Sequence, residues 1–226
     1  FQATRGGGHG DYRLIVLAPA SVQEMHDFAA GAFDLADKYR NPVMILADGQ
    51  LGQMMEPVVL SDRQPERIEK PWSLTGAKGR DRNIVRSYYP RGGGLEEHNL
   101  RMQEKLRLID RSEVRWESVQ TDSAKIMVVA YGTAARLAGG AVRLARAEGI
   151  QAGLLRPKTV WPFPTRQIAA AMDRVKKVLV VELSAGQMIE DVRLAVDGRV
   201  PVALLGRPGG GVPAVADVLA RIRELN

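Results

Sequence analysis

The residue types best suited to chemistry near the start of the chain lie in a glycine-rich loop, TRGGGHGDYR, at positions 4–13. Its histidine, His9, can accept or donate a proton near neutral pH, and Asp11 adds a carboxylate two residues later. The glycines have no side chain, so the backbone there can approach a ligand closely. From these residues alone the loop is a cradle for a phosphate-bearing ligand, the rim of an active site, or a flexible end.

The remaining polar residues show no second catalytic or metal-binding pattern. His26 and His98 fall on predicted helices and share no metal-ligand spacing with each other or with the acids, so no metal site is expected. Neither the G-x-G-x-x-G nor the G-x-x-x-x-G-K-[ST] spacing of nucleotide-binding loops occurs. Glu182 directly follows a predicted strand. A carboxylate there can bind a ligand or a partner residue, or it can cap the next helix.

The composition is that of a globular protein, since 45% of the 226 residues are hydrophobic and 26% are charged. The chain has no cysteine, which excludes disulfides and iron–sulfur clusters bound by this chain and is consistent with a reducing cytoplasm. The net charge is +6, but the basic residues are interspersed with acids and aromatic residues make up only 5%, so no nucleic-acid partner is expected. No apolar stretch is long enough to span a bilayer, and no membrane association is expected.

The first segment predicts a strand–helix–strand unit. The apolar run LIVLA at 14–18 predicts a strand buried on both faces, and VMILA at 43–47 predicts a second one. Ser21 and Glu24 have the spacing of a capping box at the start of the helix between them. This helix carries one apolar stripe, formed by Val22, Met25, Ala29, Ala32, Ala36 and Tyr39. Two strands and one helix cannot cover their own faces, so we expect half a domain, with further strands upstream of Phe1.

The next stretch, residues 50–123, is rich in Gly, Pro, Arg and Glu and has little apolar periodicity. A connection of this length is usually functional or a linker, and we interpret it as an inter-domain linker that wraps a partner surface. Its one regular element is an exposed amphipathic helix over residues 95–117. The methionine-rich loop between Asp48 and Glu56 is interpreted as an inter-subunit contact.

From residue 125 onward, strands and helices alternate. The predicted strands are 125–131, 150–155, 177–183 and 200–205, and the predicted helices are 134–148, 165–175, 187–196 and 213–225. This alternation predicts a small, doubly wound parallel sheet, in which ligands bind outside the carboxyl ends of the strands. The segment WPFP at 161–164 is held extended by its prolines and is interpreted as a packing or interface element.

Three long blocks of the sequence resemble a known family. The block GGGHGDYRLIVLAPASVQEMHDFAAGAFDLADKYRNPVMILADGQLGQMMEPV, at 6–58, resembles the α subunits of 2-oxoacid:ferredoxin oxidoreductases, most of all those of the branched-chain (2-oxoisovalerate) type. LLRPKTVWPFP at 154–164 and VVELSAGQMIEDVRLAV at 180–196 resemble the C-terminal domain of the same subunit, which is related to the transketolase C-terminal domain. The resemblance covers almost the whole chain.

The resemblance implies an α/β fold in three parts. Residues 1–60 would be the C-terminal half, a βαβ half, of a thiamine-diphosphate pyrimidine-type domain. Residues 61–123 would be a linker with one amphipathic helix, and residues 124–226 a small parallel-sheet domain of the transketolase C-terminal type.

The chemistry that the resemblance implies is the oxidative decarboxylation of a 2-oxoacid in anaerobic metabolism, with thiamine diphosphate as cofactor and coenzyme A as co-substrate. Electrons pass through iron–sulfur clusters to ferredoxin and yield an acyl-CoA and CO2. In this family the diphosphate and its magnesium lie in a partner β subunit, and the clusters lie in other subunits. The resemblance therefore implies an oligomeric cytoplasmic complex with β, γ and ferredoxin-like subunits, and ferredoxin as an indirect partner.

The sequence departs from the family pattern at the main catalytic residues. Neither the YPITP-like substrate motif nor the glutamate that activates the aminopyrimidine has a match in 1–226, so these are expected upstream and the chain alone is expected to be inactive. By resemblance the loop at 4–11 lies near the rim of the active site. His9 and Asp11 are its candidate catalytic residues, and its candidate cofactor contacts are Gly7, Gly8 and Gly10. A 2-oxoglutarate- or pyruvate-specific enzyme and a non-catalytic subunit-assembly module remain alternatives.

Overall fold

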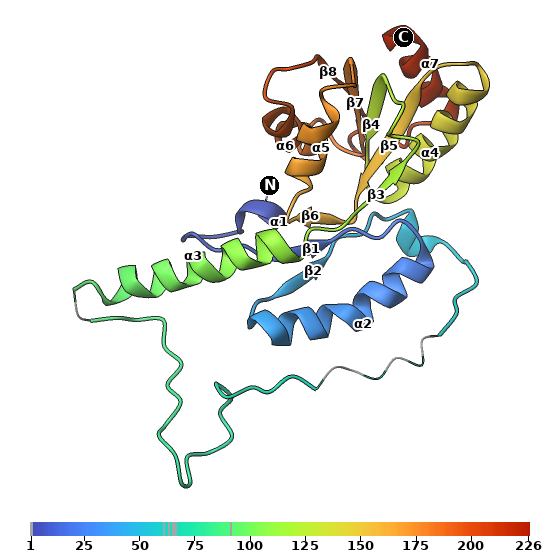
Figure 1. The fold of residues 1–226 in the computed structure, drawn as a ribbon. Helices are drawn as coiled ribbons and strands as arrows, with labels where there is room; N and C mark the ends of the chain where they lie inside the picture. Colours follow the sequence, from blue (N-terminus) through green and yellow to red (C-terminus); the bar gives the residue numbers. More distant parts are fainter. Residues whose placement is uncertain (1, 61, 63, 65–66, 91) are drawn as a thin grey trace.

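The computed structural model describes residues 2–226 except 61, 63, 65, 66 and 91, and it contains two α/β units joined at one side (Figure 1). The first unit has a three-stranded sheet and the second a five-stranded sheet. A short helix, α1 (Gln2–Arg5), precedes the first sheet. The two sheets meet where the strand β6 (Thr159–Trp161) leaves the second unit and pairs with the first.

The predicted strand–helix–strand unit is confirmed. The strands β1 (Ile15–Leu17) and β2 (Val43–Ile45) are parallel, and the helix α2 (Val22–Tyr39) connects them. The side chain of Ser21 accepts a hydrogen bond from the backbone N–H of Glu24 at 3.1 Å. The Glu24 carboxylate accepts from the N–H of Ala20, at 2.9 Å, one residue before the position that a standard capping box uses.

The first sheet takes its third strand from the second half of the chain. β6 pairs antiparallel with β1 and ends at Trp161, the first residue of the WPFP segment that the sequence analysis interpreted as a packing element. The sequence did not predict this strand, because it has three residues and pairs with a segment more than 140 residues away.

The amphipathic helix predicted over 95–117 is confirmed, but it ends earlier than predicted and is not fully exposed in its last turns. The helix α3 (Gly94–Ser112) ends earlier, and its last turns bury Leu106 and Ile109 against Ile15, Leu17 and other residues of the first core. The following segment forms the strand β3 (Trp116–Val119), which pairs antiparallel with β5 (Ala152–Pro157). Part of the stretch 61–123 therefore belongs to the core of the first unit and to the sheet of the second.

The predicted parallel sheet of the second unit is confirmed. Its order is β3-β5-β4-β7-β8, with β4, β5, β7 and β8 parallel. The new strands are β4 (Ile126–Val129), β7 (Lys177–Glu182) and β8 (Val202–Gly206). The helices α4 (Gly132–Ala147) and α7 (Val215–Leu225) cover one face, and α5 (Thr165–Ala171) and α6 (Met188–Val196) cover the other.

The outer edge of the first sheet is open among the described residues. β2 is an edge strand, and all three of its residues are only half-buried. Beside it lies an apolar groove of about 310 Å³, lined by Ala29, Ala32, Phe33, Ala36, Val43 and Ile45. The side chain of Phe33 is 76% exposed. Apolar surfaces of this kind are typical of contact sites.

Candidate functional site

A cleft lies at the junction of the two units, beside the carboxyl ends of parallel strands from both sheets. Its volume is about 520 Å³, which is within the range of small-molecule sites. Leu46 follows β2, Tyr131 follows β4, and Leu183 and Ser184 follow β7. The other lining residues come from α1, β6 and the start of α6: Gln2, Ala3, Thr4, Val160, Gln187, Met188 and Asp191. This is the position at which open α/β sheets bind ligands.

Tyr131 is the central aromatic residue of this cleft. It also lines an adjoining cavity of about 130 Å³, which Asp48 and Glu182 line as well. Burial raises the pKa of the Tyr131 phenol, and the negative charges of Glu182 and Asp48 raise it further. The phenol therefore stays protonated at neutral pH and can donate a hydrogen bond into the cleft.

Glu182 holds the turn after β7, which forms part of the cleft wall, by hydrogen bonds. It is 2% exposed. One carboxylate oxygen accepts hydrogen bonds from the hydroxyl of Ser184 at 2.6 Å and from the N–H groups of Gln187 and Met188 at 3.0 and 3.1 Å. The other accepts from the N–H of Ile189 at 3.2 Å. Of the two interpretations from sequence, the helix-capping one is therefore confirmed, and the capped turn carries Ser184 and Gln187 to the cleft.

Asp48 joins the loop after β2 to the start of α4. Its carboxylate accepts hydrogen bonds from the N–H and hydroxyl of Thr133, at 2.9 and 2.8 Å, and from the N–H of Leu51, at 2.9 Å, where the short 3-10 helix η1 (Leu51–Gln53) begins. Burial by itself raises the pKa of Asp48, but these hydrogen bonds outweigh it and hold the pKa below its usual value. Gly132, the first residue of α4, has a φ of 59°. A Cβ at this position would lie 2.9 Å from the Asp48 carboxylate.

The other acid of this loop also makes its contacts within the chain. Glu56 accepts hydrogen bonds from the guanidinium of Arg136 at 2.7 Å and from the N–H of Val22 at 2.9 Å. Both acids that flank the loop therefore hold the two units of one chain together. The interpretation of the loop as an inter-subunit contact stays open only for its exposed side chains, such as Met55.

An ion-pair cluster around Arg156 of β5 also joins the two units. Arg156, 6% exposed, makes a two-pronged contact with the Glu24 carboxylate, with both N–O distances at 2.7 Å. It also contacts Glu117 of β3 at 2.6 and 2.8 Å, and Lys158 lies 3.0 Å from Glu24. Burial opposes ionisation of Glu24, but the contacts with Arg156, Ala20 and Lys158 lower its pKa to about 2. The cluster fixes α2 of the first unit against the sheet of the second.

Comparisons with known proteins give the family of this chain. Residues 2–120 match the family described as pyruvate flavodoxin/ferredoxin oxidoreductase, thiamine diphosphate-binding, and residues 124–218 match the pyruvate:ferredoxin oxidoreductase core domain II. The chain belongs to the 2-oxoacid:ferredoxin oxidoreductase family.

Two relatives and one solved structure show how close the likeness is. The chain is 47% identical to the ketoisovalerate oxidoreductase subunit VorB of Methanothermobacter thermautotrophicus, over 99% of this chain and 64% of that protein. It is 34% identical to the 2-oxoglutarate synthase subunit KorA of the same organism, over 98% of this chain and 66% of the relative. The 2-oxoglutarate:ferredoxin oxidoreductase from Magnetococcus marinus, solved with 2-oxoglutarate, coenzyme A and succinyl-CoA bound, matches 99% of this chain and 44% of its own, with a TM-score of 0.75 at 21% identity, which shows a shared fold.

The glycine-rich loop of this family member directly follows α1, which lines the cleft. His9, Gly7 and Gly8 are exposed, whereas Gly10 and Asp11 line a separate polar pocket of about 360 Å³ between the loop and α3. The cleft is lined instead by α1, which directly precedes the loop. Arg5, at the end of α1, forms an ion pair with Asp191 of α6. The catalytic and cofactor roles of the five loop residues stay predictions.

Two of the loop glycines have a local structural reason. A Cβ on Gly6 would lie 3.1 Å from the ring of Tyr12, and a Cβ on Gly8 would lie 3.2 Å from its hydroxyl. Gly6 also has a φ of 75°. The glycines therefore let Tyr12 fold back over the loop. Sequence reasoning placed Tyr131 at the carboxyl end of the predicted strand 125–131, where open sheets bind ligands, but did not single it out as a site residue.

The cleft residues fit one part of thiamine diphosphate better than the other. Leu46, Val160, Met188 and Tyr131 offer apolar and aromatic surface for a flat ring, and Gln187 with other polar residues can bond its edge. Among residues 2–226 apart from the five undescribed ones, no group of three or more His, Asp or Glu side chains could hold a metal ion. The described residues of the cleft suit the ring of the cofactor. In the same part of the chain, no helix is long and apolar enough to cross a membrane.

Proposed function

We propose that this chain is part of the α subunit of a thiamine-diphosphate-dependent 2-oxoacid:ferredoxin oxidoreductase. The enzyme would oxidatively decarboxylate a 2-oxoacid to an acyl-CoA and CO2 and reduce ferredoxin. The observation that carries the proposal is the agreement between the thiamine-binding family match over residues 2–120 and a cleft that this segment forms with the following domain. Because the chain spans 64% of its ketoisovalerate relative, the activity belongs to the longer protein and its complex.

The substrate we propose is 2-oxoisovalerate. The 47% identity to a ketoisovalerate subunit, against 34% to a 2-oxoglutarate synthase subunit, supports this choice over 2-oxoglutarate. A pyruvate enzyme has only the family descriptions in its favour.

We propose that the ring of thiamine diphosphate lies in the cleft, against Tyr131 and Met188. Bound there, the cofactor would supply the carbanion chemistry that decarboxylates a 2-oxoacid. The role of this chain is to bind and orient the ring: the neutral Tyr131 phenol donates a hydrogen bond, and the turn that Glu182 caps holds Ser184 and Gln187 in place. Magnesium and the diphosphate would be held by a partner β subunit.

The predicted roles of the glycine-rich loop are part of the same proposal. The loop follows α1, which lines the cleft, and its exposure leaves His9 and Asp11 able to reach a ligand held by another subunit. Gly7, Gly8 and Gly10 would supply close backbone contacts with that ligand. His9 would move a proton near neutral pH.

The partners we propose are β, γ and ferredoxin-like subunits in a cytoplasmic complex, with the iron–sulfur clusters in those subunits. The open edge of β2 and the apolar groove beside Phe33 support a first domain completed by further polypeptide. We propose the domain division 1–60, 61–123 and 124–226, in which the middle segment also contributes α3 to the first core.

The experiment that tests this function is a viologen-reduction assay of the complete complex with coenzyme A and each 2-oxoacid in turn. The expected result is the highest kcat/KM with 2-oxoisovalerate and dependence on added thiamine diphosphate. The 226-residue chain alone is the matched control and should show no turnover. Turnover by that chain alone would contradict the proposal. So would a complete complex that fails to reduce viologen with any of the 2-oxoacids.

A further inference from the structure

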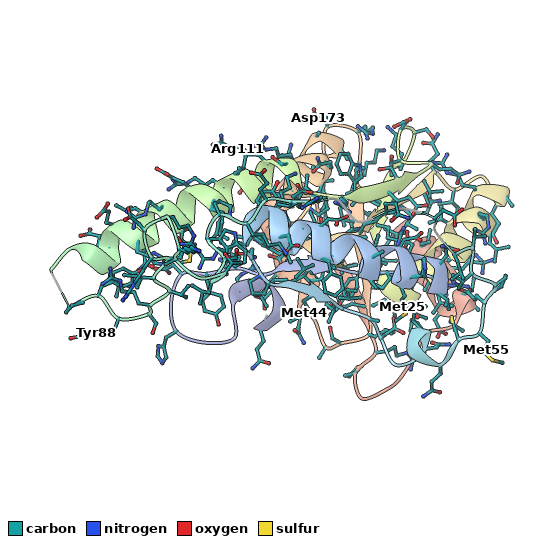
Figure 2. All side chains as sticks on the ribbon, turned by 90° about the horizontal axis from the view of Figure 1, so that it is seen from below. Met25, Met44, Met55, Tyr88, Arg111 and Asp173 are labelled. Carbon is teal, nitrogen blue, oxygen red and sulfur yellow. The ribbon has the colours of Figure 1, made fainter. Side chains whose placement is uncertain are left out.

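Residues 70–90, called the arm below, run outside both sheets between η1 and α3. Figure 1 shows this segment projecting from the body of the molecule, and Figure 2 places Tyr88 at its periphery near one end of α3. The arm carries large apolar side chains that are 60–75% exposed: Leu74, Ile84, Val85 and Tyr88. Apolar side chains gathered on a projecting segment are typical of a surface that binds another macromolecule.

The arm is attached to the body at its beginning. The ammonium of Lys70 lies 2.5 Å from the carboxylate of Asp37 on α2. Close by, the guanidinium of Arg40 lies over the ring of Trp72, 4.6 Å from its centroid. These contacts hold the first residues of the arm against the end of α2.

The arm also closes on itself and is attached again at its far end. The side-chain amide of Asn83 donates hydrogen bonds to the carbonyls of Pro71 and Ser73, at 2.7 and 2.9 Å. The ring of Tyr89 lies 5.1 Å from the ring of His98 on α3. A segment that is already shaped loses less conformational entropy when it binds a partner.

The charge of the arm decides the kind of partner. Between residues 78 and 90 the sequence has four basic residues, Lys78, Arg80, Arg82 and Arg86, and one acid, Asp81. Arg80 bonds backbone carbonyls of the arm itself. Lys78 and Arg82 are exposed and have no hydrogen bond or ion pair among the described residues.

We propose that the arm docks onto an acidic, partly apolar surface of another protein subunit of the complex. The proposal rests on the proposed function only in assuming that such subunits exist. A second copy of this chain is a poor partner, because the chain carries a net charge of +6. A nucleic acid would leave Ile84, Val85 and Tyr88 without apolar contacts, whereas a protein surface can bury them together with the charges.

The first test measures binding of the full-length subunit to three labelled probes by fluorescence anisotropy at low salt. The probes are the acidic copolymer poly(Glu,Tyr), poly-L-glutamate of equal length, and duplex DNA. The expected order of affinity is poly(Glu,Tyr), then poly-L-glutamate, then DNA. No binding to poly(Glu,Tyr), or tighter binding to DNA, overturns the proposal, and the second result assigns the arm to nucleic acid.

Matched variants show whether the arm is responsible. Lys78→Glu/Arg82→Glu should weaken binding to poly(Glu,Tyr) tenfold or more. The control Arg166→Glu/Lys176→Glu changes one lysine and one arginine that are also exposed and unpaired among the described residues, so it lowers the net charge equally. It should weaken binding less than threefold. Equal losses for both variants overturn the proposal.

The apolar part of the proposal has its own variant. Ile84→Ser/Val85→Ser should lower the affinity for poly(Glu,Tyr) to that for poly-L-glutamate and leave the affinity for poly-L-glutamate unchanged. These side chains are exposed, so the circular dichroism spectrum and melting temperature should match those of the unaltered chain. An unchanged preference for poly(Glu,Tyr) would contradict an apolar contribution.

The complete complex separates this proposal from the proposed function. The fraction of the α subunit that co-elutes with the other subunits should fall at least tenfold for Lys78→Glu/Arg82→Glu and remain unchanged for the control variant. An active complex that assembles equally well with the arm variant overturns the docking proposal and leaves the reaction standing. A complex that depends on the arm but turns over no 2-oxoacid overturns the reaction and leaves docking standing.

Discussion

The ion pair between Glu24 and Arg156 allows a quantitative prediction for Glu24→Gln. Glutamine has nearly the shape of glutamate but lacks the charge, so the change removes the ionic part of a contact that joins the two units. The Glu24 side chain is 18% exposed, and its pKa falls from 4.5 to about 2 in the folded chain. A depression of this size corresponds to about 3 kcal/mol of folding free energy at pH 7.

The sign of the pH dependence follows from the lowered pKa. The stabilisation is fully present above the unfolded pKa of 4.5 and is lost as the pH falls through the folded pKa of about 2. Linkage then gives a contribution of about 3 kcal/mol at pH 7 and about 1 kcal/mol at pH 3. The difference between the unaltered chain and Glu24→Gln should shrink by the same amount.

The assay is urea unfolding of both proteins at pH 7 and at pH 3, followed by circular dichroism. Glu190→Gln on α6 is the control, because this exposed carboxylate is at the other side of the second sheet. It should change the free energy of unfolding by less than about 0.5 kcal/mol at either pH. If Glu24→Gln lowers the free energy of unfolding by the same amount at pH 3 as at pH 7, the charge of Glu24 is not what stabilises the contact, and the reasoning fails.

Three further predictions concern the cleft. Tyr131→Phe should lower kcat/KM of the complete complex about tenfold, the value of about one hydrogen bond, without lowering the melting temperature of the chain; an unchanged kcat/KM would remove Tyr131 from the site. Gly132→Ala should destabilise the chain by about 1–3 kcal/mol in urea unfolding, because φ is positive and the new Cβ would meet Asp48, whereas Gly139→Ala, with ordinary contacts at 3.6 Å inside a helix, should be neutral or stabilising. Glu182→Gln should lower the free energy of unfolding in urea by about 1–3 kcal/mol, because a carboxamide cannot accept all four hydrogen bonds that hold the start of α6. An unchanged free energy of unfolding would show that the cap is dispensable.

The sequence predicted the elements whose signals are local. The four parallel strands of the second unit are continuous apolar runs, and each is followed by a helix with its own periodicity, so the parallel sheet followed from known rules, whereas its strand order comes from the structure. Ser21 was placed correctly at the start of α2 because capping depends on neighbours three residues apart. Glu182 was left with two interpretations, because the same position after a strand serves a cap or a ligand.

The elements that the sequence did not predict depend on distant partners. β6 pairs with the side of β1 that β2 leaves free, and β3 pairs with the side of β5 that β4 leaves free. Neither has a strong strand pattern of its own. The apolar stripe of α2 also divides in the structure: Tyr39 faces the core, whereas Ala29 and Ala36 line the open groove beside β2. A single helical stripe could not show that two different surfaces share it.

The segment from the end of β5 to α5 explains why the cleft depends on both units at once. Within a few residues it carries Arg156, which holds Glu24 of the first unit, and Val160, which lines the cleft from β6. β6 belongs to the first sheet while β5 belongs to the second, so the chain passes from one sheet to the other between them. A rotation of one unit against the other would therefore strain the Arg156 contact and move Val160 relative to Tyr131. A variant that weakens the ion-pair cluster, such as Glu24→Gln, should therefore raise the KM of the complete complex more than it lowers kcat, and an unchanged KM would show that the cluster does not act on the cleft.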